Sequence, residues 1–91
     1  MNIKQLDKAR ALLNDGYPVI AVGMDATGTA NVHFDAMPVA TITAMVAPLA
    51  CDPDDIDWMA FGTDGSPLPG SHWTVYVGGG VCLCGTVAVA S

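Results

Sequence analysis

Residues 72–90 read HWTVYVGGGVCLCGTVAVA, and this stretch decides the fold. Two runs rich in β-branched and aromatic residues flank three glycines, which is the pattern of a β-hairpin. Because side chains alternate between the two faces of a strand, one face of this hairpin is apolar and the other is small and mildly polar. On the apolar face we expect Trp73, Val75, Val77, Val81, Leu83, Val87 and Val89. No Asp, Glu, Lys or Arg occurs in residues 65–91, so the hairpin must be covered by the rest of the chain or by a partner.

The length of 91 residues fits one small domain, residues 1–91. A hydrophobic content of 52% supports a single core. Three cysteines, two of them in a C-x-C arrangement on one strand, favour a reduced, cytoplasmic protein. The first ten residues lack the apolar core of a signal peptide, and Pro or Gly interrupts every long uncharged stretch, so we expect no membrane span.

The charge is strongly asymmetric. The net charge is −6, all nine acidic residues are Asp, and the three basic residues, Lys4, Lys8 and Arg10, lie within the first ten positions. Binding to phosphate groups needs Lys and Arg, so we expect no direct contact with nucleic acid and none with an anionic membrane. The partner that such a chain favours is a basic protein surface.

The first half of the chain predicts a helix followed by a hairpin. Residues 3–14 place Ile3, Leu6, Ala9 and Leu13 in one stripe at helical spacing, which we expect to face the core. Gly16 is a typical residue to end this helix. Residues 17–35 form two β-rich runs around the turn sequence DATG at 25–28. The second run alternates, with Ala30, Val32 and Phe34 facing inward and His33 facing outward.

Residues 38–47 fit either a helix or a strand. Helical spacing of the apolar residues, with Pro38 at the start and Pro48 at the end, favours a helix. The sequence therefore predicts an α+β domain in the order α-β-β-α-α-β-β. We expect residues 17–35 and 72–90 to form two hairpins of one antiparallel sheet, with the helices packed on one face.

The sequence CDPDDIDWMAFG at 51–62 supplies the second helix of the middle region and the candidate binding site. Asp52 is the expected N-cap, Pro53 the first helical residue and Gly62 the end. Clustered carboxylates beside aromatic rings are typical of a surface that binds a basic partner. The predicted partner-binding residues are Asp52, Asp54, Asp55, Asp57, Trp58 and Phe61. If this helix is instead structural, with Trp58 in the core and the acids as caps, the acidic binding face should lie around Asp25, His33 and Asp35.

Other chemistries find little support. Cys51, Cys82, Cys84 and a histidine could supply four zinc ligands, but the C-x-x-C spacing is absent. The run DPDDID lacks the central Gly and closing Glu of a calcium loop. Residues 78–80 precede a strand without a nearby cation, unlike a phosphate-binding loop. No nucleophile motif is present, so we expect a non-enzymatic protein with reduced cysteines, no metal and no cofactor.

In size and charge, the chain resembles the small acidic proteins with which phages and mobile elements block host defence, including anti-CRISPR proteins. The resemblance implies an inhibitor that mimics nucleic-acid charge or plugs a basic groove. The leading hypothesis is therefore an interaction protein for a basic, nucleic-acid-handling partner. The alternatives are a small-ligand-binding or sequestering protein, with its pocket between sheet and helices or at a dimer seam, and a structural subunit of a larger assembly.

The chain also predicts a homodimer. Residues 81–90 have no charge and no Pro, and we expect them to form an unprotected apolar edge of the sheet.

Overall fold

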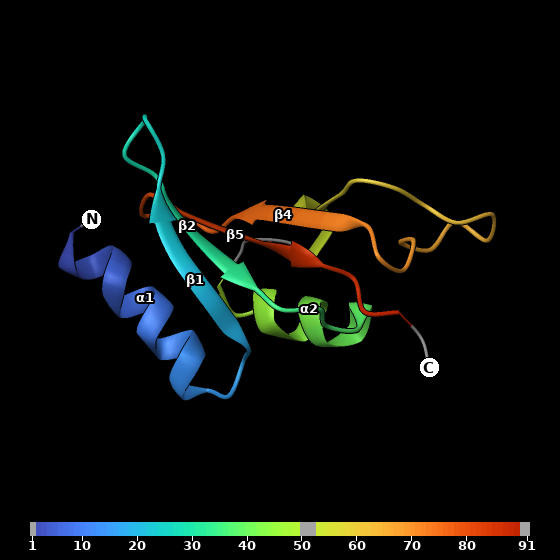
Figure 1. Cartoon of the computed structure of the whole chain (residues 1–91), viewed down its shortest axis with the longest axis horizontal. Coiled ribbons are helices and arrows are strands. Elements are labelled where there is room, and N and C mark those ends of the chain that lie inside the picture. Colours follow the sequence, from blue (N-terminus) through green and yellow to red (C-terminus); the bar gives the residue numbers. More distant parts are fainter. Residues whose placement is uncertain (1, 50–52, 90–91) are drawn as a thin grey trace.

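The structure is a computed structural model that describes residues 2–49 and 53–89. Two helices and a five-stranded sheet form one α+β domain (Figure 1). The elements are α1 (Ile3–Asn14), β1 (Val19–Met24), β2 (Ala30–Phe34), α2 (Val39–Val46), a 3-10 turn (Pro53–Asp55), β3 (Asp57–Trp58), β4 (His72–Tyr76) and β5 (Val81–Thr86). The α+β fold predicted from the sequence is confirmed.

Both predicted hairpins are present. β1 pairs antiparallel with β2 around the turn at Asp25–Gly28, where the amide of Gly28 donates to the carbonyl of Asp25 at 3.1 Å. β4 pairs antiparallel with β5 around the three glycines. Gly78, Gly79 and Gly80 all have positive φ, between 64° and 82°, a conformation that glycine adopts without a steric penalty.

The two hairpins join differently from the prediction. The strand order is β1-β2-β5-β4-β3, and β2 runs parallel to β5, so the sheet is mixed rather than wholly antiparallel. β5 therefore lies in the middle of the sheet with a neighbour on each side. The expectation of an unprotected edge over residues 81–90 is wrong for residues 81–86, because β5 pairs with a strand on each side. Residue 90 lies outside the described residues. The ends of the sheet are β1 and β3.

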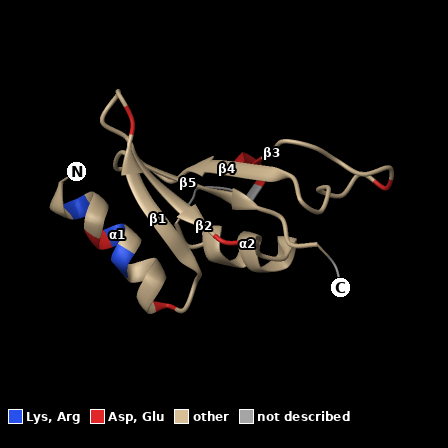
Figure 2. Ribbon diagram, viewed as in Figure 1, with Lys and Arg blue, Asp and Glu red and all other residues tan. Residues whose placement is uncertain are grey.

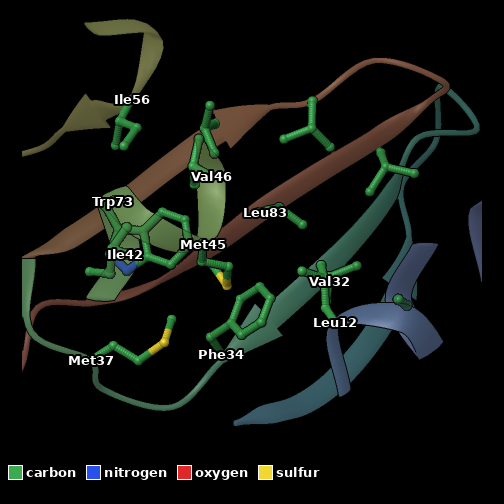
Figure 3. Packing of buried hydrophobic residues seen from close by; sticks show 14 of the residues in the cluster. Leu12, Val32, Phe34, Met37, Ile42, Met45, Val46, Ile56, Trp73 and Leu83 are labelled. Atoms are coloured by element: carbon green, nitrogen blue, oxygen red, sulfur yellow. The ribbon is translucent and has the colours of Figure 1, made fainter. Parts of the chain in front are cut away.

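Both helices pack on the same face of the sheet, which we call the inner face. Leu12 of α1 and Met45 of α2 belong to one buried cluster with Val32, Leu83 and Trp73 of the strands. Phe34, labelled in Figure 3, belongs to the same cluster, and its ring stacks on that of Trp73 with centroids 5.9 Å apart. The inner-face residues predicted on β2, β4 and β5 are buried, as the alternation requires. Val87 is buried as well, but the prediction is wrong for Val89, which lies beyond the end of β5 and is exposed.

The helix α1 is where the sequence predicted, but it buries a different side. Gln5, Ala9 and Leu12 are buried, whereas Ile3, Leu6 and Leu13 are exposed. The predicted apolar stripe is therefore wrong except at Ala9. The cause is Gln5, whose side-chain amide donates to the carbonyls of Gly28 at 3.1 Å and Gly80 at 2.8 Å. These bonds rotate α1 so that a polar residue faces the two hairpin turns.

The helix α2 settles the ambiguity of residues 38–47 in favour of a helix, with Pro38 at the N-cap position. Residues 53–61 do not form the predicted second helix. They form a 3-10 turn followed by the short strand β3, which pairs with β4. Pairing with β4 satisfies backbone groups that a helix would satisfy locally, and this tertiary contact outweighs the capping signals of the Asp residues.

Candidate functional site

The predicted binding residues do not form one helical surface. Asp52 lies outside the described residues, and Asp54 and Asp55 are exposed on the 3-10 turn. Asp57 is exposed on β3, opposite Thr74. The next residue, Trp58, is half-buried against the core beside Trp73, so its ring is not a free anchor.

Phe61, the last of the predicted set, is more than half exposed. It forms an isolated bridge with Pro67 in the loop that leads to β4. The structure therefore divides the predicted site. Asp57 joins the sheet, Trp58 joins the core, and Phe61 belongs to a separate loop.

A different surface emerges on the side of the sheet away from the helices, which we call the open face. It consists of the side chains that alternate with the inner-face residues, and neither described helix packs on it. Its residues are Asn31, His33, Asp57, His72, Thr74, Tyr76, Cys82, Cys84 and Thr86. One row crosses four strands, from Asp57 through Thr74 and Cys84 to His33.

One end of the open face is hollowed. A cavity of about 510 Å³ lies over the ends of β2, β4 and β5. Side chains from five different segments line it: Ile20, His33, Asp35, Met59, His72 and Thr86. Ile20 and Met59 are each more than half exposed, as is Tyr76 elsewhere on the same face. Exposed large apolar side chains gathered on an uncovered sheet are typical of a binding surface.

The thiols of the open face are hydrogen bonded. Cys84 Sγ lies 3.2 Å from His33 Nδ1, and Cys82 Sγ lies 3.1 Å from Thr74 Oγ1. Burial, with a smaller contribution from Cys82, raises the pKa of the Cys84 thiol. A raised pKa favours the protonated thiol over the thiolate.

A metal site would need more ligands than Cys84 and His33. Within residues 2–49 and 53–89, no group of three His, Cys, Asp or Glu side chains could hold a metal ion. Cys51, the third cysteine of the hypothetical zinc set, lies outside that range.

Charge is distributed unequally between the two sides of the sheet. Figure 2 shows Lys and Arg confined to α1, where Lys4, Lys8 and Arg10 lie. The open face carries Asp57, and Asp35 lines its hollow. At the tip of the first hairpin, Asp25 lies on the same side, since its Oδ2 accepts from Asn31 Nδ2 at 3.4 Å. The hydroxyl of Thr27 lowers the pKa of Asp25, which favours its charged form.

The sequence predicted part of the open face. The alternation of β2 and β4 predicted His33, His72, Thr74 and Tyr76 on the face opposite the core, and Asp25, His33 and Asp35 were the predicted alternative site. It did not find Ile20 or Met59. Ile20 lies at a register shift between β1 and β2, and Met59 follows a strand that was predicted as a helix.

Comparison with known proteins gives no relative. No family model, no curated protein and no solved structure matches the chain. Among the described helices, none is long and apolar enough to cross a membrane.

Proposed function

We propose that this protein is a non-enzymatic interaction protein whose open face docks on a basic surface of another protein. The observation that carries the proposal is the uncovered sheet face. It combines exposed Ile20, Met59 and Tyr76 with Asp35 and Asp57, while the cations lie on α1. Carboxylates would accelerate the encounter with a cationic surface, and the apolar side chains would supply buried area once docked.

A basic groove of a nucleic-acid-handling complex is the partner with the matching chemistry. Such a groove binds phosphates through Lys and Arg, and a carboxylate-bearing surface competes for the same side chains. The resemblance in size and charge to phage and mobile-element inhibitors, anti-CRISPR proteins among them, adds the specific hypothesis that the partner belongs to a cytoplasmic host-defence system. Trp58 is not part of the proposed contact, because it packs against the core.

The test begins with affinity capture from the native host and identification of the partner by mass spectrometry. Binding kinetics of the purified pair are then measured over a range of salt concentrations. Asp35→Asn with Asp57→Asn should slow association and flatten its dependence on salt. Tyr76→Ala and Met59→Ala should instead speed dissociation, each by roughly tenfold if the side chain is an anchor.

The matched control is Asp7→Asn with Asp15→Asn, which removes the same two charges from α1 and its C-cap. It should leave both rate constants unchanged. Equal effects of the control pair and of Asp35→Asn with Asp57→Asn would mean that only net charge matters, and the proposed docking face would be wrong.

A second candidate function is the binding of a small ligand in the hollow. Its volume of about 510 Å³ is within the range of small-molecule sites. The thiol–imidazole pair of Cys84 and His33, with His72 nearby, would supply a few polar contacts. A library of metabolites and nucleotides should then include a compound that raises the melting temperature, and His33→Ala should abolish the shift. No thermal shift across the library would count against this function.

A further inference from the structure

The two edges of the sheet differ in how well they are protected. β3 is two residues long and carries Asp57, which are features that discourage pairing with another strand. β1 is six residues long, reads VIAVGM and contains neither a charge nor Pro. It has β2 on one side and no other described strand on the other.

The free edge of β1 offers backbone hydrogen-bonding groups. The amide of Asp25 donates to the carbonyl of Thr29 at 3.0 Å, which fixes the phase of the hydrogen-bonding ladder between β1 and β2. Ladder bonds of an antiparallel pair occur at every second residue, so Met24 and Val22 direct their N–H and C=O groups away from β2. These groups are the template on which another strand can pair.

The side chains along this edge are apolar and accessible. Val22 is 36% exposed and Met24 is 44% exposed. Beside them, α1 exposes Leu6 and Leu13, the residues that the sequence wrongly predicted in the core. An apolar groove of about 190 Å³ runs between helix and strand. Its lining is Leu6, Ala9, Arg10, Leu13, Val19 and Val22. Figure 1 shows α1 lying alongside β1.

The charges near the β1 edge favour a second copy of this chain as its binding partner. Residues 2–15 carry three cations and two Asp, whereas residues 16–91 carry seven Asp and no Lys or Arg. Two copies meeting through their open faces would bring like carboxylates together. Lys8 Nζ donates to the carbonyls of Val77 and Gly78 of the same chain, each at 3.4 Å, whereas Lys4 and Arg10 are exposed. Two copies meeting through α1 and β1 would bring Lys4 and Arg10 of each near Asp7 and Asp15 of the other, which is the contact with the least repulsion for an acidic chain.

We propose that the β1 edge, with the exposed side of α1, binds a second copy of this chain. The two β1 strands pair antiparallel about a two-fold axis perpendicular to the sheet, so that residue contacts are reciprocal. The result is one continuous sheet with both α1 helices on one side. Both open faces then lie on the other side, where they form one extended surface. The contact differs from the dimer predicted from the sequence, which was placed at residues 81–90.

The test is sedimentation equilibrium of the full chain over a wide range of protein concentration. The wild-type chain should dimerise, and Val22→Lys should raise the dissociation constant of the dimer at least about tenfold. A lysine on an edge strand discourages pairing with another strand. The matched control is Ala40→Lys on the exposed side of α2, which should leave the dissociation constant unchanged.

Cross-linking tests the same contact between two copies if the Val22→Lys chain does not fold. With Cys51, Cys82 and Cys84 replaced by Ser, Val22→Cys should form a covalent dimer under mild oxidation, and Ala40→Cys should not. Three results would overturn the proposal. They are a wild-type monomer at every concentration, a dimer that Val22→Lys leaves intact, or equal cross-linking at both positions. None of these results bears on partner binding by the open face, so the two proposals fail separately.

Discussion

The inner and open faces are built from alternate residues of the same strands, yet they have opposite chemistry. On β5, Leu83 is fully buried beneath the helices, and its neighbour Cys84 lies on the open face beside His33. Stability and the proposed recognition would therefore be encoded in alternate positions of one strand. A mutation in β5 should therefore change either stability or partner binding, according to whether its side chain lies on the inner or the open face.

The largest expected effect comes from consecutive residues of β5. Leu83→Ala should lower the free energy of unfolding by about 3 kcal/mol, because it leaves a cavity among fully buried side chains. Cys84→Ala removes a half-buried thiol and should cost less than about 1 kcal/mol. Urea denaturation of both variants measures the difference. Equal losses in the free energy of unfolding would contradict the difference between the two faces, since the open face would then stabilise the fold as much as the core does.

Gln5 is a polar exception among the apolar residues buried on the helix side of the sheet. Gln5→Ala removes the donors to Gly28 and Gly80 and the capping bond from the amide of Asn2. The expected loss is about 2 kcal/mol, as two carbonyls lose their partners. Thermal or urea unfolding measures it, with the exposed Lys4→Ala as control. A Gln5→Ala variant as stable as Lys4→Ala would show that these bonds add nothing.

The smallest effect belongs to the open face and depends on pH. Burial raises the pKa of Cys84, so the folded state holds this proton more tightly than the unfolded chain does. The resulting stabilisation is complete below the ordinary thiol pKa of 9.0 and is lost as the pH rises through the folded value. Denaturation on either side of pH 9.0 should reveal a loss that Cys84→Ala removes. If the wild-type and variant chains lose stability equally, another group is responsible.

Local signals in the sequence located most of the elements. The turn sequence DATG, the three glycines and the alternation of Ala30, Val32 and Phe34 are short-range patterns, and each predicted the observed hairpin or face. The prolines at 38 and 48 likewise favoured the helix that α2 forms. Such predictions succeed because turn geometry and side-chain alternation are fixed by neighbouring residues.

The errors share a different cause, which is contact between distant segments. Asp and Pro at 52–55 are good helix starters, but Asp57 pairs with Thr74, and the amide of Met59 donates to the carbonyl of His72 at 3.0 Å. Hydrophobic spacing predicted the wrong side of α1, because no pattern of apolar residues reveals that Gln5 bonds to two distant turns. Parallel pairing of β2 with β5 is equally invisible in either strand alone.

The sequence predicted that the candidate site is acidic, but it did not predict how the residues of the site are arranged. The sequence identified acidic residues without nearby cations, and Asp57 does lie on the open face. It did not predict that Trp58 and Asp57 would point to opposite sides of a strand, because a helical interpretation places neighbouring residues on one broad surface. The hollow depends on five segments, and its position follows from the strand order.

The central position of β5 also determines when the domain can be completed during synthesis. β1 and β2 leave the ribosome early, but β2 gains its second neighbour only when residues 81–86 have emerged. Within the sheet, the first hairpin contacts the second only through the pairing of β2 with β5. A nascent chain shorter than this point therefore holds two separate fragments with an open strand on β2, which is a form prone to mispairing and attractive to chaperones. Of the described strands, β5 comes after the other four in the chain, and it joins both halves of the sheet.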